Sequence, residues 1–440
     1  MIVSLGLKLS KVGCLALDAI RIAVGFSFFA VFSLCVVFAI PDNFFTGNTQ
    51  KSLDIIGAEG LVARTSPSIC STQVDNYTNA IMLNIASHTT SNCFDAALSS
   101  YMYGEESYHS VDPIDALANS VNKHIEDFDS FNGNSYGRYW HGYLVVLKPL
   151  LMLFDISTIR LVLAALSLSM IFYLSYWLAC RFSFRYGLLF ALSFVPFHLA
   201  SCFMSLSLSI SLMVSLICSC IVISSRSKDN LIMRNPSTMF FFFGILIAFF
   251  DFLCTPVLSL AFPMLFHFMD NRKNLNCKTI IKLFVVMSIS WCIGYFVFWS
   301  LKWILASIFT SSNVIFDAVE QIGVRSSATG GIGDSATSIS RLDGVAANVR
   351  LAFSKKSLLI YLFIVLLAFV ARFRSGFRSS NRLMVSLLAY ILVSILPLFW
   401  FIVVSNHSFI HSWFTYRGLI VVVACMFLFI ADILNQDFSE

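Results

Sequence analysis

The residues of this sequence most able to do chemistry are polar side chains that stand out from apolar surroundings. Asp75 opens a segment in which Tyr77, Ile81 and Ile85 recur at helical spacing. A carboxylate there is a common N-cap, and it could equally serve as a general base at a membrane surface. We therefore take Asp75 as the candidate catalytic residue and expect its helix to lie on the membrane surface.

The run 135–142 holds a second group of candidates, in which aromatic and basic side chains are interleaved. Tyr139 and Trp140 could belong to the aromatic belt found at lipid interfaces. That belt does not explain Arg138 and His141, whose donors beside an aromatic platform would suit a sugar ring or a phosphate. Loop position favours function, so we expect these four residues to bind substrate or carrier.

Two charged residues lie within or beside apolar runs. Asp251 is functional or partnered by default, because a carboxylate inside a span costs about 2.5–3.5 kcal/mol on insertion scales; capping of the turn that follows it is the alternative. Arg417 lies about one turn inside the last apolar run, opposite every basic cluster. It needs an anionic partner, either a lipid phosphate or an acid such as Asp251.

His407 and His411 are four residues apart, as in a metal pair on one helix face. No Glu stands between them as in the H-E-x-x-H motif. We therefore expect no metal and no resident cofactor, with a divalent ion as the alternative, and we assign the pair to substrate or carrier binding together with Asp251 and Arg417.

The twelve cysteines include no C-x-x-C pair. Only Cys70 and Cys93 fall in a long polar segment, where an oxidising compartment would allow a disulfide between them.

Composition requires lipid as the solvent for much of this chain. Of its 440 residues 58% are hydrophobic and 12% charged, against about 45–50% and about 25% in soluble proteins. The net charge of +5 comes from basic clusters between apolar runs, so it reports topology and no nucleic-acid partner. We predict an all-α polytopic fold with about ten spans, at 20–40, 158–179, 186–203, 205–224, 237–254, 256–269, 279–304, 357–373, 383–404 and 413–432.

The positive-inside rule puts all basic clusters on the cytoplasmic side if the stretch 143–154 is re-entrant or interfacial and does not cross. Both termini are then cytoplasmic, and the candidate residues all map to the outer face. The predicted divisions are a first span (1–41), an extracytoplasmic loop with surface helices and the re-entrant segment (42–157), a helical bundle (158–304), a mobile Gly-rich extracytoplasmic loop (305–356) and C-terminal spans (357–440).

This layout resembles the polytopic glycosyltransferases of the GT-C class. The segment Asp75-Asn76-Tyr77 is similar to the Asp-Glu-x-x-Tyr pattern of the family's first outer loop and departs from it at Asn76, where an acid is common. Tyr143–Phe154, with its Lys148-Pro149, followed by the span Leu161–Ala179 looks like the family's hydrophobic re-entry. The likeness covers about the first half of the chain.

The resemblance implies transfer of a sugar, with inversion, from a polyprenyl-phosphate carrier to an acceptor on the outer face of a bacterial plasma membrane. Asp75 would be the general base, Arg138 or Arg417 would hold the carrier's phosphate, and Tyr139 and Trp140 would stack on sugar. Membrane lipid would be the other partner.

Three other functions are compatible with the same residues. The first is a transporter or flippase for lipid-linked substrates, although the expected internal repeat is not visible in the sequence. The second is an acyl- or phosphotransferase that uses the histidine pair. The third is a non-catalytic assembly protein of an envelope polysaccharide pathway, whose outer loops bind partners.

Overall fold

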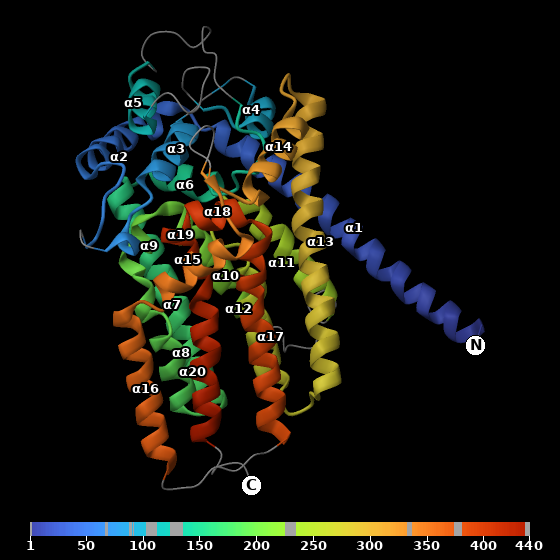
Figure 1. Ribbon diagram of the computed structural model, residues 1–440. Helices are drawn as coiled ribbons and strands as arrows, with labels where there is room; N and C mark the ends of the chain where they lie inside the picture. Colours follow the sequence, from blue (N-terminus) through green and yellow to red (C-terminus); the bar gives the residue numbers. More distant parts are fainter. Residues whose placement is uncertain are drawn as a thin grey trace.

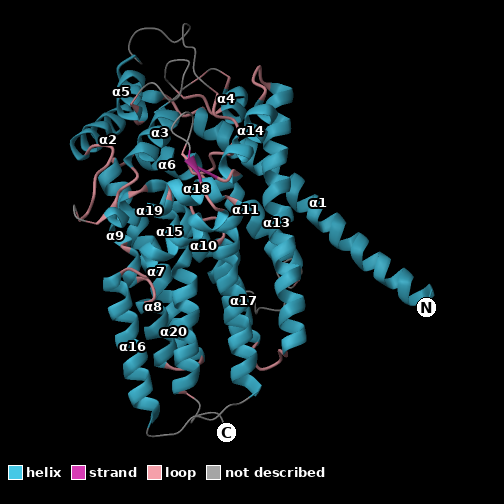
Figure 2. Cartoon of the chain, in the orientation of Figure 1, coloured by secondary structure: helices cyan, strands magenta, loops and turns pink. Residues whose placement is uncertain are grey.

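The computed structural model describes residues 2–66, 69–87, 90, 92–102, 112–123, 135–224, 235–331, 337–373 and 381–435. Within these ranges the only strands are the two-residue β1 (Thr329–Gly330) and β2 (Thr337–Ser338), which pair antiparallel. Helices make up almost all the rest (Figure 2). The predicted all-α fold class is confirmed.

Six helical segments of the described chain are long and apolar enough to cross a membrane. They are Leu17–Phe38 within α1 (Ile2–Phe38), α7 (Ile156–Arg181), α10 (Leu206–Ser224), α13 (Cys277–Phe309), α17 (Asn381–Val403), and Ser412–Leu434, which contains α19 (Ser412–Thr415) and α20 (Ile420–Leu434). A seventh span results if α15 (Arg341–Ala352) and α16 (Lys355–Phe373) cross together, although they are bent by 66°. The chain is therefore an integral membrane protein.

The count of ten spans is not confirmed. The expected span 186–203 is divided into α8 (Phe184–Leu192), η3 (Val195–Phe197) and α9 (Leu199–Met204), with Pro196 and the left-handed His198 at the breaks. Helix α11 (Pro236–Phe250) has 15 residues and α12 (Leu258–Asn271) has 14. At 1.5 Å per residue each is roughly 22 Å long, short of the ~30 Å hydrocarbon layer. Most of their side chains are buried by other helices, so protein replaces lipid around them.

A layer of short helices covers one end of the bundle, while α16, α17 and α20 extend to the opposite end (Figure 1). We call these the outer and inner ends; which end faces the cytoplasm remains a prediction. The layer contains α2 (Thr46–Glu59), α3 (Asn76–Ser87), α4 (Cys93–Ser99), α5 (Pro113–Lys123), α6 (Leu144–Leu151) and α14 (Val314–Ser326), with α18 (Ser405–Ile410) beneath it. The remaining 3-10 turns are η1 (Asp42–Phe44), η2 (Cys70–Thr72) and η5 (Tyr416–Leu419).

Three expectations about the outer end can be compared with this layer. Helix α6 has eight residues, too few to cross, which confirms that 143–154 is not a span. Helix α3 forms where its periodicity predicted, but its expected surface location is wrong, because nearly all its side chains are buried under α2 and α5. The described parts of 305–356 form α14 and α15 instead of an open loop; residues 332–336 lie outside the description.

Candidate functional site

Asp75 is buried at the outer end, where it caps α3. Its Oδ1 accepts the Thr78 backbone N–H at 3.1 Å, and its Oδ2 accepts the Ser207 hydroxyl at 3.3 Å. Burial raises the pKa of the Asp75 carboxyl, against the opposing hydrogen bonds and the charge of Arg417. A carboxylate whose pKa is raised is a stronger proton acceptor, which suits a general base.

The second buried acid, Asp251, begins the α11–α12 connection, residues Asp251–Val257, just beyond the end of α11. Both carboxylate oxygens of Asp251 accept the Cys254 N–H, at 3.0 and 3.2 Å. Burial raises the pKa of Asp251 to about 7, even though hydrogen bonds from Ser211 and the connection oppose the shift. Leu253 has φ +66°, a strained conformation for a bulky residue, and such strain is often found at functional sites.

Helix α10 brings the two acids to one face through hydroxyls four residues apart. Ser207 reaches Asp75, and Ser211 reaches both Asp251 and the Thr255 hydroxyl, the latter at 3.1 Å. The Cys254 thiol lies among them: burial raises its pKa, and the charges of Asp251 and Asp75 add to the shift. Asp75 and Asp251 therefore belong to one buried acidic pair at the start of α10.

The histidine pair meets the α11–α12 connection through His407. His407 Nε2 is 2.9 Å from the Leu253 carbonyl, so this nitrogen carries the proton. Its Nδ1, at 3.4 Å, and His411 Nε2, at 3.2 Å, then accept from Nη1 of Arg325 on α14. Burial lowers the pKa of both imidazoles, that of His411 to about 3, and Arg325 adds to both shifts.

Arg325 was not among the sequence candidates, because a basic residue in a polar loop carries no distinguishing signal. It is half-buried, and no carboxylate of the described residues lies within 4.0 Å of its guanidinium. Among the described residues, its charge is therefore held by neutral groups alone.

The guanidinium lies beside both imidazoles where a bridging metal would have to sit. Groups of three or more His, Cys, Asp or Glu able to hold a metal are absent from the described part of the chain. The pair is therefore organised around a fixed cation supplied by the protein.

Two side chains of the run 135–142 have partners within the protein that the sequence did not reveal. Arg138 Nη1 lies 3.0 Å from each carboxylate oxygen of Asp317 on α14. Trp140 is fully buried, stacks on Phe298 at 4.5 Å and donates to the Phe298 carbonyl at 2.8 Å. The Trp140 ring therefore belongs to the core, and Tyr139 is buried as well; that either ring stacks on sugar stays a prediction.

His141 packs directly against the α11–α12 connection. Its ring lies 5.1 Å from that of Phe252, and its Nε2 is 2.8 Å from the Tyr136 carbonyl. Burial lowers the pKa of His141 to about 3, so the ring is neutral. The backbone at Gly142 lies close to Phe249 of α11, and only glycine fits there, because a Cβ would come within 2.4 Å of the Phe249 ring.

Arg417 is buried near Asp75. Its Nε donates to the Phe197 carbonyl at 3.2 Å, while Nη2 donates to the Ser71 carbonyl at 3.2 Å and the Ser201 hydroxyl at 2.7 Å. No described carboxylate lies within 4.0 Å, so the expected ion pair with Asp251 is not formed. The acid whose pKa Arg417 lowers is Asp75.

The predicted disulfide is not present in the described structure. Cys93 is a free thiol at the start of α4, and its sulfur contacts the Thr90 carbonyl at 3.8 Å. The side chain of Cys70 lies outside the described ones.

Asp251, His141 and His407 thus meet at the α11–α12 connection, and Asp75 and His411 are linked to it through neighbouring side chains, which no sequence spacing could show. A scan against protein-family models, a search of curated proteins and a search of solved structures each found no match. The functional argument therefore rests on the geometry of this outer-end site.

Proposed function

We propose that this chain is a membrane glycosyltransferase of the GT-C type, which moves a sugar from a polyprenyl-phosphate carrier to an acceptor hydroxyl at the outer end. One observation carries the proposal. Buried Asp75 and half-buried Arg325, which has no carboxylate partner among the described residues, are both linked to the α11–α12 connection, Asp75 through Ser207 and Cys254 and Arg325 through His407. Inverting transfer needs a base and a phosphate-binding group on opposite sides of the sugar.

In the proposed reaction, the acceptor oxygen attacks the anomeric carbon and its proton passes to a carboxylate oxygen of Asp75. The bond between the anomeric carbon and the phosphate oxygen breaks, and polyprenyl phosphate leaves with the electron pair. The raised pKa of Asp75 favours proton uptake, and the Ser207 hydroxyl holds the oxygen that would receive it.

Arg325 is a better candidate than Arg138 for the leaving phosphate. The Arg138 charge is already balanced by Asp317 at 3.0 Å, whereas Arg325 is bonded to neutral imidazoles. A charge-assisted hydrogen bond from Arg325 would stabilise the negative charge that develops as the sugar leaves. Arg417 would instead set the charge balance around Asp75.

The test is sugar transfer from radiolabelled polyprenyl-phosphate sugars by protein in liposomes, with D75N compared to D155N. Asp155 is a matched control, since it caps α7 by accepting the Thr158 N–H at 3.0 Å, as Asp75 caps α3. Both variants should cost about 1 kcal/mol of stability or less. Only D75N should lose 10²–10⁴-fold in transfer rate, roughly the contribution of general base catalysis. Full activity in a folded D75N protein would refute the proposed base.

A transporter of lipid-linked substrates is a second candidate, favoured by the break between α9 and α10. Interrupted helices beside buried charges are frequent at transporter binding sites, and Ser205 at this break is extended and bonded to the Asp75 backbone. The two functions separate in sealed liposomes: a transporter moves the labelled lipid between leaflets without an acceptor, whereas the transferase consumes it only when an acceptor hydroxyl is present.

A further inference from the structure

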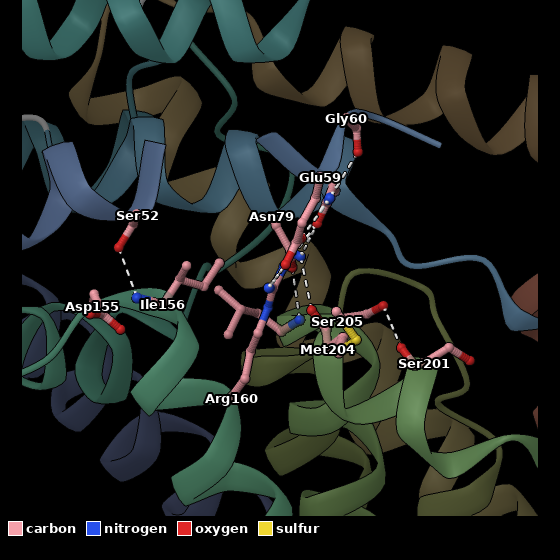
Figure 3. Close-up of polar contacts among 12 residues, drawn as sticks. Ser52, Glu59, Gly60, Asn79, Asp155, Ile156, Arg160, Ser201, Met204 and Ser205 are labelled. Carbon is pink, nitrogen blue, oxygen red and sulfur yellow. Dashed lines mark hydrogen bonds and ion pairs between the residues drawn. The ribbon is translucent and has the colours of Figure 1, made fainter. Parts of the chain in front are cut away.

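A buried ion pair lies next to the acidic pair but does not touch it. Arg160 of α7 makes two hydrogen bonds to Glu59 of α2, Nη1 to Oε1 at 2.7 Å and Nη2 to Oε2 at 3.0 Å (Figure 3). The Arg160 side chain is 7% exposed and that of Glu59 is 22% exposed. Replacing such a pair with apolar residues is often neutral or stabilising, so stability alone does not account for it.

The pair fixes Asn76, the residue that follows Asp75. Asn76 Nδ2 donates to Glu59 Oε2 and the Gly60 carbonyl, both at 2.9 Å. Its Oδ1 accepts from Arg160 Nη2 at 2.9 Å and from Asn79 Nδ2 at 3.0 Å. An amide offers two donors and two acceptor sites, and all four are used. An acid at position 76 would lose both donors and face the Glu59 carboxylate, which explains the departure from the family pattern.

Asn79 extends the network to the interrupted helix. Its Nδ2 donates to the Met204 carbonyl at 3.1 Å, and its Oδ1 accepts the Leu206 N–H at 2.8 Å. One amide therefore satisfies the backbone on both sides of Ser205, the extended residue between α9 and α10 (Figure 3). The Ser205 hydroxyl accepts the Asp75 N–H at 2.9 Å and donates to the Ser201 carbonyl at 2.9 Å.

We infer that Glu59, Arg160, Asn76 and Asn79 are positioning residues for Asp75, because they hold the first turn of α3 against the α9–α10 break. The inference rests on the proposed function in one respect only, that Asp75 is the residue whose position matters for transfer. The network touches no reacting group; it sets where the Asp75 carboxylate stands relative to Ser207. Loosening it would let water reach the carboxylate without removing any hydrogen bond of Asp75 itself.

The test measures the protonation of Asp75 directly, by infrared titration of its carboxyl band in the full-length protein, with the band assigned from D75N. In E59L/R160M, an apolar replacement that removes the whole pair, the protein should fold, and the titration midpoint of Asp75 should fall by about one unit or more, a tenfold change in proton affinity. The rate constant of transfer, kcat, should fall at least tenfold while the KM for the donor stays within about twofold.

N79A gives an independent reading if the double variant does not fold, and N48A is its control. Asn48 makes one hydrogen bond, to the Leu151 carbonyl at 2.8 Å, away from the network. N79A should lower the Asp75 midpoint and N48A should not. A folded N79A or E59L/R160M protein with the native midpoint would overturn the inference. If the midpoint shifts but D75N keeps full transfer, the positioning network stands and the base role fails.

Discussion

The two ends of the bundle differ in how their buried charged side chains are paired. At the inner end Asp432 of α20 accepts from Arg272 at 2.9 Å, from the Tyr390 hydroxyl at 2.9 Å and from the Tyr186 hydroxyl. Arg181 and Asp270 form a second ion pair there at 3.5 Å. At the outer end Arg138 and Arg160 also have ion-pair partners, but Asp75, Asp251, Arg325 and Arg417 are buried or half-buried, and no described residue gives any of these four an ion pair.

The difference separates structure from function. At the inner end each acid is matched by an arginine that ties α12 to α20 or to α7, so these charges fasten helices together. At the outer end, burial of charges without opposite partners is costly, and a fold tolerates it where a substrate brings the missing charge or takes up a proton.

Breaking the inner-end pair should be the most damaging change. R272M leaves Asp432 buried with hydroxyl partners alone and should cost about 3 kcal/mol, the low end for a buried pair because Arg272 is partly exposed. R272M/D432L should recover most of that loss of stability. Neither variant should change the KM for a polyprenyl-phosphate donor, measured on the folded protein. Chemical unfolding in detergent measures the stability. A double variant as unstable as R272M would contradict the view that the Arg272–Asp432 pair only holds α12 and α20 together.

Removing Arg325 should do the reverse, with little effect on stability and a large effect on binding. R325Q should lose roughly 10- to 100-fold in affinity for polyprenyl phosphate, because one charge-assisted hydrogen bond is worth about 1.5–3 kcal/mol. Its stability should change by about 1 kcal/mol or less, since its imidazole partners are neutral. R350Q, at an exposed arginine of α15, is the control for binding measured by fluorescence titration. Equal losses in both variants would point to unspecific attraction.

Asp251 should make the protein less stable as the pH rises. Its pKa of about 7 lies above the ordinary value of 3.8, so the folded state holds the proton more tightly than the unfolded state. The resulting stabilisation is complete below pH 3.8 and is lost as the pH rises through 7. D251N keeps a neutral side chain at every pH, so its melting temperature relative to that of the native protein should rise by a few degrees between pH 5 and pH 8. Parallel melting profiles from pH 5 to 8 would contradict this assignment.

The smallest effect should come from Trp140. W140F removes the hydrogen bond to the Phe298 carbonyl and should cost about 1 kcal/mol in unfolding free energy. The KM for the sugar donor should not change, because the ring is enclosed in the core. A raised KM with native stability would restore Trp140 to the sugar site.

Much of the fold followed from hydropathy, while the number of spans did not. A window of apolar residues shows that a segment avoids water, but it does not show whether lipid or protein surrounds it. Helices α11 and α12 are as apolar as a span, yet other helices bury them, and they end at lengths too short to cross. The helical spacing of its apolar residues predicted helix α3, but that spacing could not show that α3 is buried in the outer layer.

The candidate site, too, could be predicted from the sequence only in part. Asp75, Asp251 and the histidine pair could be proposed because their charge or spacing conflicts with an apolar neighbourhood. Their partners could not, because Ser207 lies 132 residues from Asp75 and Arg325 lies 82 residues from His407. The Arg160–Glu59 pair spans 101 residues and gave no local signal at all. Only the folded chain brings such pairs together.

The most direct test of the account is a structure of the protein in a nanodisc with polyprenyl phosphate bound. We predict that the phosphate binds at the outer end, with an oxygen within about 3 Å of the Arg325 guanidinium. A phosphate bound at the inner end beside Arg181 and Arg272, with Arg325 still bonded only to its histidines, would contradict it.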